Sequence, residues 1–139
     1  MLDTAKNSLD VVWTKPDSID PLSVLGGFGF GKPTRCPLVP FAWIDMPLLG
    51  SDDESAIECW RTAKPVKHGS SGAVEYAVTD DYVFGTVSYP DNSFLDETTE
   101  IAYSELLNFL SDNGFNGVWR LWNHIRDINA EESGLERYK

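Results

Sequence analysis

The order of two hydrophobic periodicities between residues 73 and 125 constrains the fold more than any other feature of the sequence. Residues 73–79 and 82–89 are rich in β-branched and aromatic side chains and flank Asp80 and Asp81, which predicts a β-hairpin. A helical period follows, and residues 115–125 then return to a period of two, which predicts a strand. This order predicts an α+β fold, a mixed β-sheet with helices packed on one face.

The helical stretch carries its own start and stop signals. Asp96 is expected to be the N-cap, with Glu97 and Glu100 in the first turn, where the helix dipole favours acidic groups. Gly114 is expected to end the helix. The apolar side chains recur at i, i+3, i+4 and i+7, which gives one apolar stripe: Tyr103, Leu106, Leu107 and Leu110.

Upstream of the hairpin, the sequence indicates shorter extended elements. Residues 11–13 predict an edge or first strand, and residues 56–62 predict a strand that alternates Ile57 and Cys59 with Glu58 and Trp60. Residues 37–49 contain three prolines, which favour an extended edge segment or an irregular wrap. The glycines of residues 18–31 match neither phosphate-binding pattern, so they indicate close approach of backbone and aromatic rings.

Composition excludes several classes of protein. The chain has 139 residues, 42% of them hydrophobic, which suits one compact domain. Its net charge of -11 argues against nucleic acid or an anionic membrane as a partner, since both require clustered lysine and arginine. No apolar run is long enough to cross a bilayer, and no signal peptide is evident. A soluble, cytoplasmic protein is expected.

The sequence contains no metal-binding pattern. Cys36 and Cys59 form no CxxC pair and lack matched histidines, so buried free thiols are expected in place of a disulfide or zinc site. The acidic residues 52–54 lack calcium-loop spacing and predict a solvated turn. Neither a metal nor a cofactor is expected.

The C-terminal run W-R-L-W-N-H-I-R-D-I-N-A-E-E-S-G-L-E-R-Y-K resembles a motif of the chorismatases, R-x-W-N-Y-x-P-x-I-N followed by G-L-E-R-Y-[RK]. The upstream V-F-G-T-V-S-Y-P and A-Y-S-E-L-L-N-F-L fit the order in that family, so the resemblance covers about residues 82–139. His124 departs from the usual tyrosine, and Arg126 from the usual proline. The matching positions are Asn123, Ile128, Asn129, Gly134, Leu135, Glu136, Arg137 and Tyr138.

The resemblance implies an enzyme that releases pyruvate from chorismate and is built from two joined domains of the YjgF/Rid type. In that family G-L-E-R-Y closes the first domain and continues as F-x-x-G-R into a second domain, which holds most of the catalytic groups. Residues 1–139 are therefore expected to be the N-terminal domain of a longer protein, with chorismate bound largely through the missing second domain.

Three residues are expected to bind substrate. The resemblance makes Tyr138 a hydroxyl donor lining the pocket and Arg137 a carboxylate partner, while an ion pair with Glu131, Glu132 or Glu136 is the alternative for Arg137. Arg120 either contacts substrate, stacks on an aromatic face or pairs across the sheet.

Three further residues, Asn123, Asn129 and Gly134, are expected to shape the loop around I-R-D-I. His124 titrates near neutrality, but no serine or cysteine at motif spacing completes a nucleophilic triad. A function of another class stays open: a free-standing Rid-like trimer that binds small carboxylated metabolites between its subunits.

Overall fold

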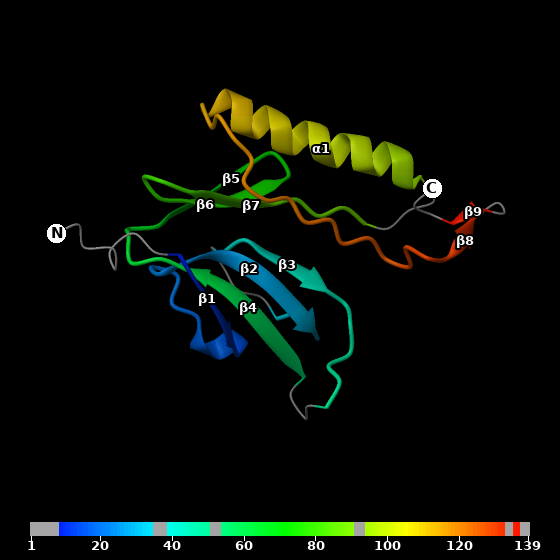
Figure 1. Ribbon diagram of the computed structural model, residues 1–139, viewed down its shortest axis with the longest axis horizontal. Coiled ribbons are helices and arrows are strands. Elements are labelled where there is room, and N and C mark those ends of the chain that lie inside the picture. Colours follow the sequence, from blue (N-terminus) through cyan, green and yellow to red (C-terminus); the bar gives the residue numbers. More distant parts are fainter. Residues whose placement is uncertain (1–8, 35–38, 51–53, 91–93, 133–134, 137–139) are drawn as a thin grey trace. The chain divides into compact units, whose positions relative to one another are not determined.

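The structure, a computed structural model, describes residues 9–34, 39–50, 54–90, 94–132 and 135–136. The elements of these described residues are β-strands, one α-helix and a short 3-10 helix, which confirms the α+β class (Figure 1). By its internal contacts the chain divides into two compact units, residues 1–88 and residues 89–139, and each is described by itself. No helix among the described residues is long and apolar enough to cross a membrane.

The first unit contains a four-stranded sheet formed by β1 (Asp10–Thr14), β2 (Val24–Gly31), β3 (Phe41–Ile44) and β4 (Ser55–Arg61). The strand order is β1-β4-β2-β3, in which β2 and β3 run parallel and the other pairs antiparallel. The predicted mixed sheet is confirmed, as are the strands expected at residues 11–13 and 56–62. A short 3-10 helix, Pro16–Ser18, follows β1, and the proline-rich stretch supplies the edge strand β3.

The same unit contains a second, antiparallel sheet in the order β5-β6-β7, formed by β5 (Lys67–Ser71), β6 (Val74–Val78) and β7 (Val83–Thr86). The β6–β7 pair is the predicted hairpin. Strand β5 was not predicted, because its sequence K-H-G-S-S has neither β-branched residues nor an apolar alternation. Its backbone pairing with β6 makes it a strand at the sheet edge, where polar side chains face solvent.

Strand β2 lies at the centre of the first unit because both of its faces are covered. On one face Val24 packs with Val39, Phe41, Ile57 and Cys59 in the main core. On the other, the ring of Phe28 meets that of Phe84 edge-on at 6.3 Å, which joins β2 to the three-stranded sheet. Burial on both faces explains the glycine-rich sequence, since a Cβ at Gly26 would lie 2.3 Å from the Phe84 ring.

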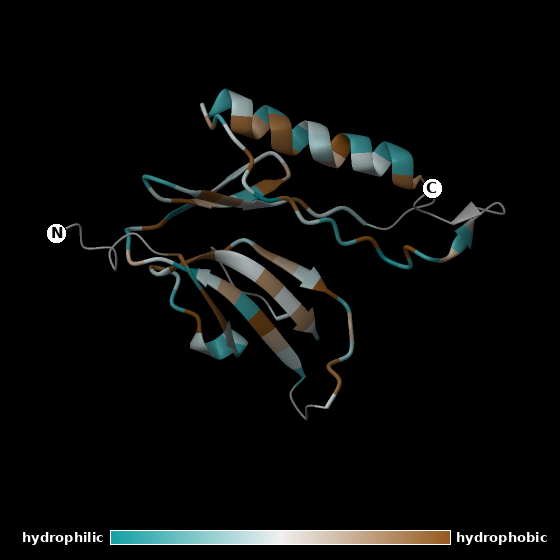
Figure 2. Cartoon of the chain, in the orientation of Figure 1, coloured by the Kyte–Doolittle hydropathy of each residue, from teal (hydrophilic) through white to brown (hydrophobic). Residues whose placement is uncertain are grey.

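The second unit is organised around α1 (Leu95–Asp112), along which hydrophobic and hydrophilic bands alternate in Figure 2. The prediction that Asp96 is the N-cap is wrong: the N-cap is Phe94, whose carbonyl accepts from the N–H of Thr98 at 3.1 Å. Asp96 instead lies in the first turn, where its charge still opposes the helix dipole. Gly114, at φ 73°, follows the C-cap Asn113, as predicted for the helix end.

The predicted stripe on α1 is only partly buried. Leu107 is 50% exposed, while Tyr103, Leu106 and Leu110 are half-buried. The helix residue that is buried is Phe109, whose ring lies 6.0 Å from that of Phe115 just past the helix end. The expectation of helices packed on one face of a sheet stays a prediction.

The strand predicted for residues 115–125 is wrong. In the structure this stretch is irregular, and it belongs to a returning segment, residues 115–130, that runs back along α1 (Figure 1). A strand requires a neighbour for its backbone groups, and no described strand pairs with these residues. The short pair β8 (Glu131–Glu132) and β9 (Leu135–Glu136) follows.

Candidate functional site

The predicted substrate-binding residues are only partly covered by the structure. Arg137 and Tyr138 lie outside the described residues, as does the predicted loop-shaping residue Gly134, so their roles stay predictions. Arg120 lies in the returning segment with an exposed side chain, and it forms no ion pair with any residue that the structure describes. Its role in substrate binding stays a prediction.

The turn of the returning segment is formed by residues 126–129. Asp127 adopts a left-handed backbone conformation, φ 48°, and its carbonyl accepts from the N–H of Ala130 at 2.8 Å. Arg126, which stands where a proline is usual in the resembled motif, lies 3.5 Å from Asp127 in an exposed ion pair. Such a pair adds little stability. Asn129 is exposed within this turn, and its loop-shaping role stays a prediction.

The second predicted loop-shaping residue, Asn123, has a side-chain partner on α1. The hydroxyl of Tyr103 donates to Oδ1 of Asn123 at 3.1 Å, and Nδ2 of Asn123 donates back to that hydroxyl at 2.9 Å. The sequence placed Tyr103 in the apolar stripe of the helix. The signal that was available is the hydroxyl itself, the one hydrogen-bonding group in a stripe otherwise made of leucines.

His124, next to Asn123, is exposed, yet desolvation by its surroundings lowers its pKa below the usual value of 6.5. The neutral ring is therefore the major form at pH 7. A neutral imidazole offers one donor and one acceptor, as does the tyrosine hydroxyl usual at this position of the motif. The substitution thus keeps hydrogen-bonding capacity without adding a charge.

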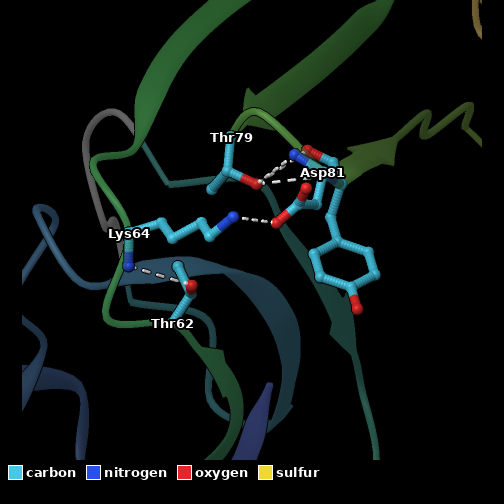
Figure 3. Close-up of polar contacts among 5 residues, drawn as sticks. Thr62, Lys64, Thr79 and Asp81 are labelled. Carbon is cyan, nitrogen blue, oxygen red and sulfur yellow. Dashed lines mark hydrogen bonds and ion pairs between the residues drawn. The ribbon is translucent and has the colours of Figure 1, made fainter. Parts of the chain in front are cut away.

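The first unit contains a polar cluster that was not predicted from the sequence (Figure 3). Lys64, just past β4, forms an ion pair with Asp81 in the turn between β6 and β7. Oγ1 of Thr79 accepts the N–H of Asp81 at 3.3 Å and that of Tyr82 at 3.1 Å, and Oγ1 of Thr62 accepts the N–H of Lys64 at 3.2 Å. The hydrogen bond from Lys64 to Asp81 raises the pKa of the lysine. These contacts link the two sheets.

This cluster is structural, because the cation and the carboxylate satisfy each other and the threonines bond backbone groups. The available sequence signal was threonine two residues before a turn position, a frequent local hydrogen-bonding pattern. Among the described residues, no group of three or more histidine, cysteine or acidic side chains is placed to hold a metal ion.

The chain matches proteins of one family. The family model described as "Chorismatase FkbO/Hyg5-like, N-terminal" matches residues 58–139, more than half of the chain. A 3-hydroxybenzoate synthase from Streptomyces hygroscopicus is 26% identical over 120 residues, covering 84% of this chain and 35% of the relative. A chorismatase from Streptomyces rapamycinicus is 32% identical over 89 residues, covering 63% of this chain and 27% of the relative.

A solved structure of a chorismatase has a similar fold. A crystal structure of a chorismatase superposes with a TM-score of 0.77 at 25% identity, over 94% of this chain and 41% of that one. The chain thus spans about a quarter to two fifths of the length of the proteins that it resembles.

Proposed function

This chain belongs to the chorismatase FkbO/Hyg5-like N-terminal family, and from that membership we propose that it is the N-terminal part of an enzyme that converts chorismate. The reaction releases pyruvate and leaves a hydroxybenzoate or a dihydroxycyclohexadiene carboxylate. The observation that carries the proposal is the family match over residues 58–139, which includes the W-N and G-L-E-R-Y motifs. Relatives named chorismatase and 3-hydroxybenzoate synthase support it.

The proposed role of residues 1–139 is to act as scaffold and as one edge of the substrate pocket. Cleavage of the enol ether requires protonation of the enol carbon by a general acid, while guanidinium groups hold the carboxylates of chorismate. Arg120, Arg137 and Tyr138 are the proposed binding groups of this part. Arg120 supports this role because it is an exposed cation in a chain of net charge -11.

We further propose that the domain is YjgF/Rid-like, that the protein is cytoplasmic, and that most catalytic groups lie in a following domain. The α+β fold supports the first of these. The placement of most catalytic groups in a following domain is supported because this chain matches only a part of each relative's length.

The test is to express the full reading frame that contains residues 1–139, to incubate the product with chorismate, and to follow pyruvate and the aromatic product by chromatography. We expect the protein expressed from the full reading frame to release pyruvate, and residues 1–139 alone to release none. If the full product binds chorismate without turnover and has the mass of a trimer, the enzyme proposal is wrong. The free-standing binding module is then favoured.

A further inference from the structure

We propose that Tyr103 is a positioning residue, which fixes the side-chain amide of Asn123 so that this amide binds an oxygen of the substrate. The inference rests on the proposed function for the identity of that substrate. It assigns Tyr103 a task beyond packing of α1, and it assigns Asn123 contact with substrate in addition to any role in the loop.

The geometry of the pair carries the first step. The two residues are 20 positions apart, and they are joined by reciprocal hydrogen bonds of 3.1 Å and 2.9 Å that close a ring between one hydroxyl and one amide. Two simultaneous bonds fix the rotation of the amide plane, whereas one bond would leave it free to swing. The ring of Tyr103 is half-buried on α1, so the hydroxyl is itself held in place.

Counting donors and acceptors gives the second step. An asparagine amide has two N–H groups and two lone pairs on oxygen. The tyrosine takes one of each, and no other described residue forms a hydrogen bond with the side chain of Asn123, which is exposed. One N–H and one lone pair are therefore left in a fixed orientation. The N–H suits a carboxylate or hydroxyl oxygen, which chorismate carries.

The third step concerns stability, to which the pair contributes little. A hydrogen bond adds about 0.5–1.5 kcal/mol net, and less where water competes for exposed groups such as these. The returning segment has other anchors on α1, namely the N–H of Phe115, which donates to the carbonyl of Leu110 at 2.9 Å, and the ring of Phe109. Loss of the tyrosine hydroxyl should therefore leave the segment in place and free only the amide.

The experiment uses the full-length protein and four variants: Tyr103→Phe, Asn123→Ala, the double variant, and Tyr89→Phe as a control that removes an exposed phenol hydroxyl elsewhere in the second unit. With Tyr103→Phe we expect KM for chorismate to rise roughly tenfold, kcat to change less than about twofold, and the melting temperature to fall by less than about 2 °C. Tyr89→Phe should match the wild type in all three.

The double variant decides whether Tyr103 acts through Asn123. If it does, Tyr103→Phe adds nothing to Asn123→Ala, and the double variant has the KM of Asn123→Ala. Effects that multiply would show that Tyr103 acts by another route. An unchanged KM in Tyr103→Phe, or a loss explained by a large fall in melting temperature, would also overturn the proposal.

A second readout does not depend on turnover. In a ¹⁵N-labelled full-length protein, the Nδ2 resonances of Asn123 should move to the position of a freely rotating amide in Tyr103→Phe, and in the wild type they should shift on addition of chorismate. Absence of pyruvate from the wild type would count against the proposed function alone. If the Nδ2 resonances do not change in Tyr103→Phe, or do not shift on addition of chorismate, the positioning role is wrong.

Discussion

Among the described glycines, Gly27 is the position at which an added side chain would come nearest to another atom. A Cβ at this position would lie 1.8 Å from the backbone oxygen of Glu58 on the neighbouring strand β4, and a backbone atom in a sheet cannot move aside. We expect Gly27→Ala to lower the free energy of unfolding by at least 2–3 kcal/mol, about the upper range of overpacking costs. Urea unfolding followed by tryptophan fluorescence measures it.

Gly85 on β7 provides the matched control for that substitution. Its added Cβ would meet Val74 Cγ1 at 3.5 Å, an ordinary contact, so Gly85→Ala should change the free energy of unfolding by less than about 1 kcal/mol. Equal losses in the two variants would show that the cost comes from strand glycines in general and not from the carbonyl of Glu58.

The ion pair of Lys64 and Asp81 leads to a prediction on pH. Because the folded pKa of Lys64 is raised, the pair contributes stability that is fully present below the unfolded value of 10.5 and is lost as pH rises through the folded value. Lys64→Met should lower the urea midpoint at pH 7, and its difference from the wild type should shrink above pH 10.5. Lys67→Met, an exposed lysine on β5, is the control. A difference that persists unchanged at high pH would contradict the pair as its cause.

At the scale of the element, the end of α1 is set by backbone conformation. Gly114 has φ 73° and Gly117 has no positive φ, while an added Cβ would meet nothing within 4 Å at either position. The two glycines therefore differ in conformation and not in space. We expect Gly114→Ala to cost about 1–2 kcal/mol and Gly117→Ala to be neutral or stabilising. Amide exchange at Phe115, whose N–H donates to Leu110, measures the cost, and equal exchange in both variants would refute it.

The elements also show what could be predicted from the sequence. The helix and the β6–β7 hairpin have local signals, a capping glycine and a turn between β-branched runs, and both were predicted. Strand β5 and the irregular residues 115–125 depend on which backbone lies beside them, which side-chain period does not encode. Asn123 was singled out from the motif, which is local in the sequence. Its partner Tyr103 lies 20 positions upstream, and the contact between them was found only in the structure.

For the whole molecule, the two units bury their side chains to different degrees. In the first, Ile57, Val74 and Ala77 are fully buried, whereas in the described part of the second the buried hydrophobic residue is Phe109. Since regions with few buried apolar groups open at lower free energy, amides of α1 should exchange faster than those of β4 and β6. Native-state hydrogen exchange with mass spectrometry measures this. Equal protection across both units would show that they unfold as one.

The thiol of Cys59, only 1% exposed in the core of the first unit, can serve as a chemical probe of local unfolding. A thiol reagent reaches it only when the four-stranded sheet opens, so the rate of labelling counts openings of that sheet alone. In a chain whose Cys36 is replaced by serine, one mass increment therefore reports opening of the first unit without a dye, a denaturant or a substrate. That measurement requires no assumption about what the chain binds.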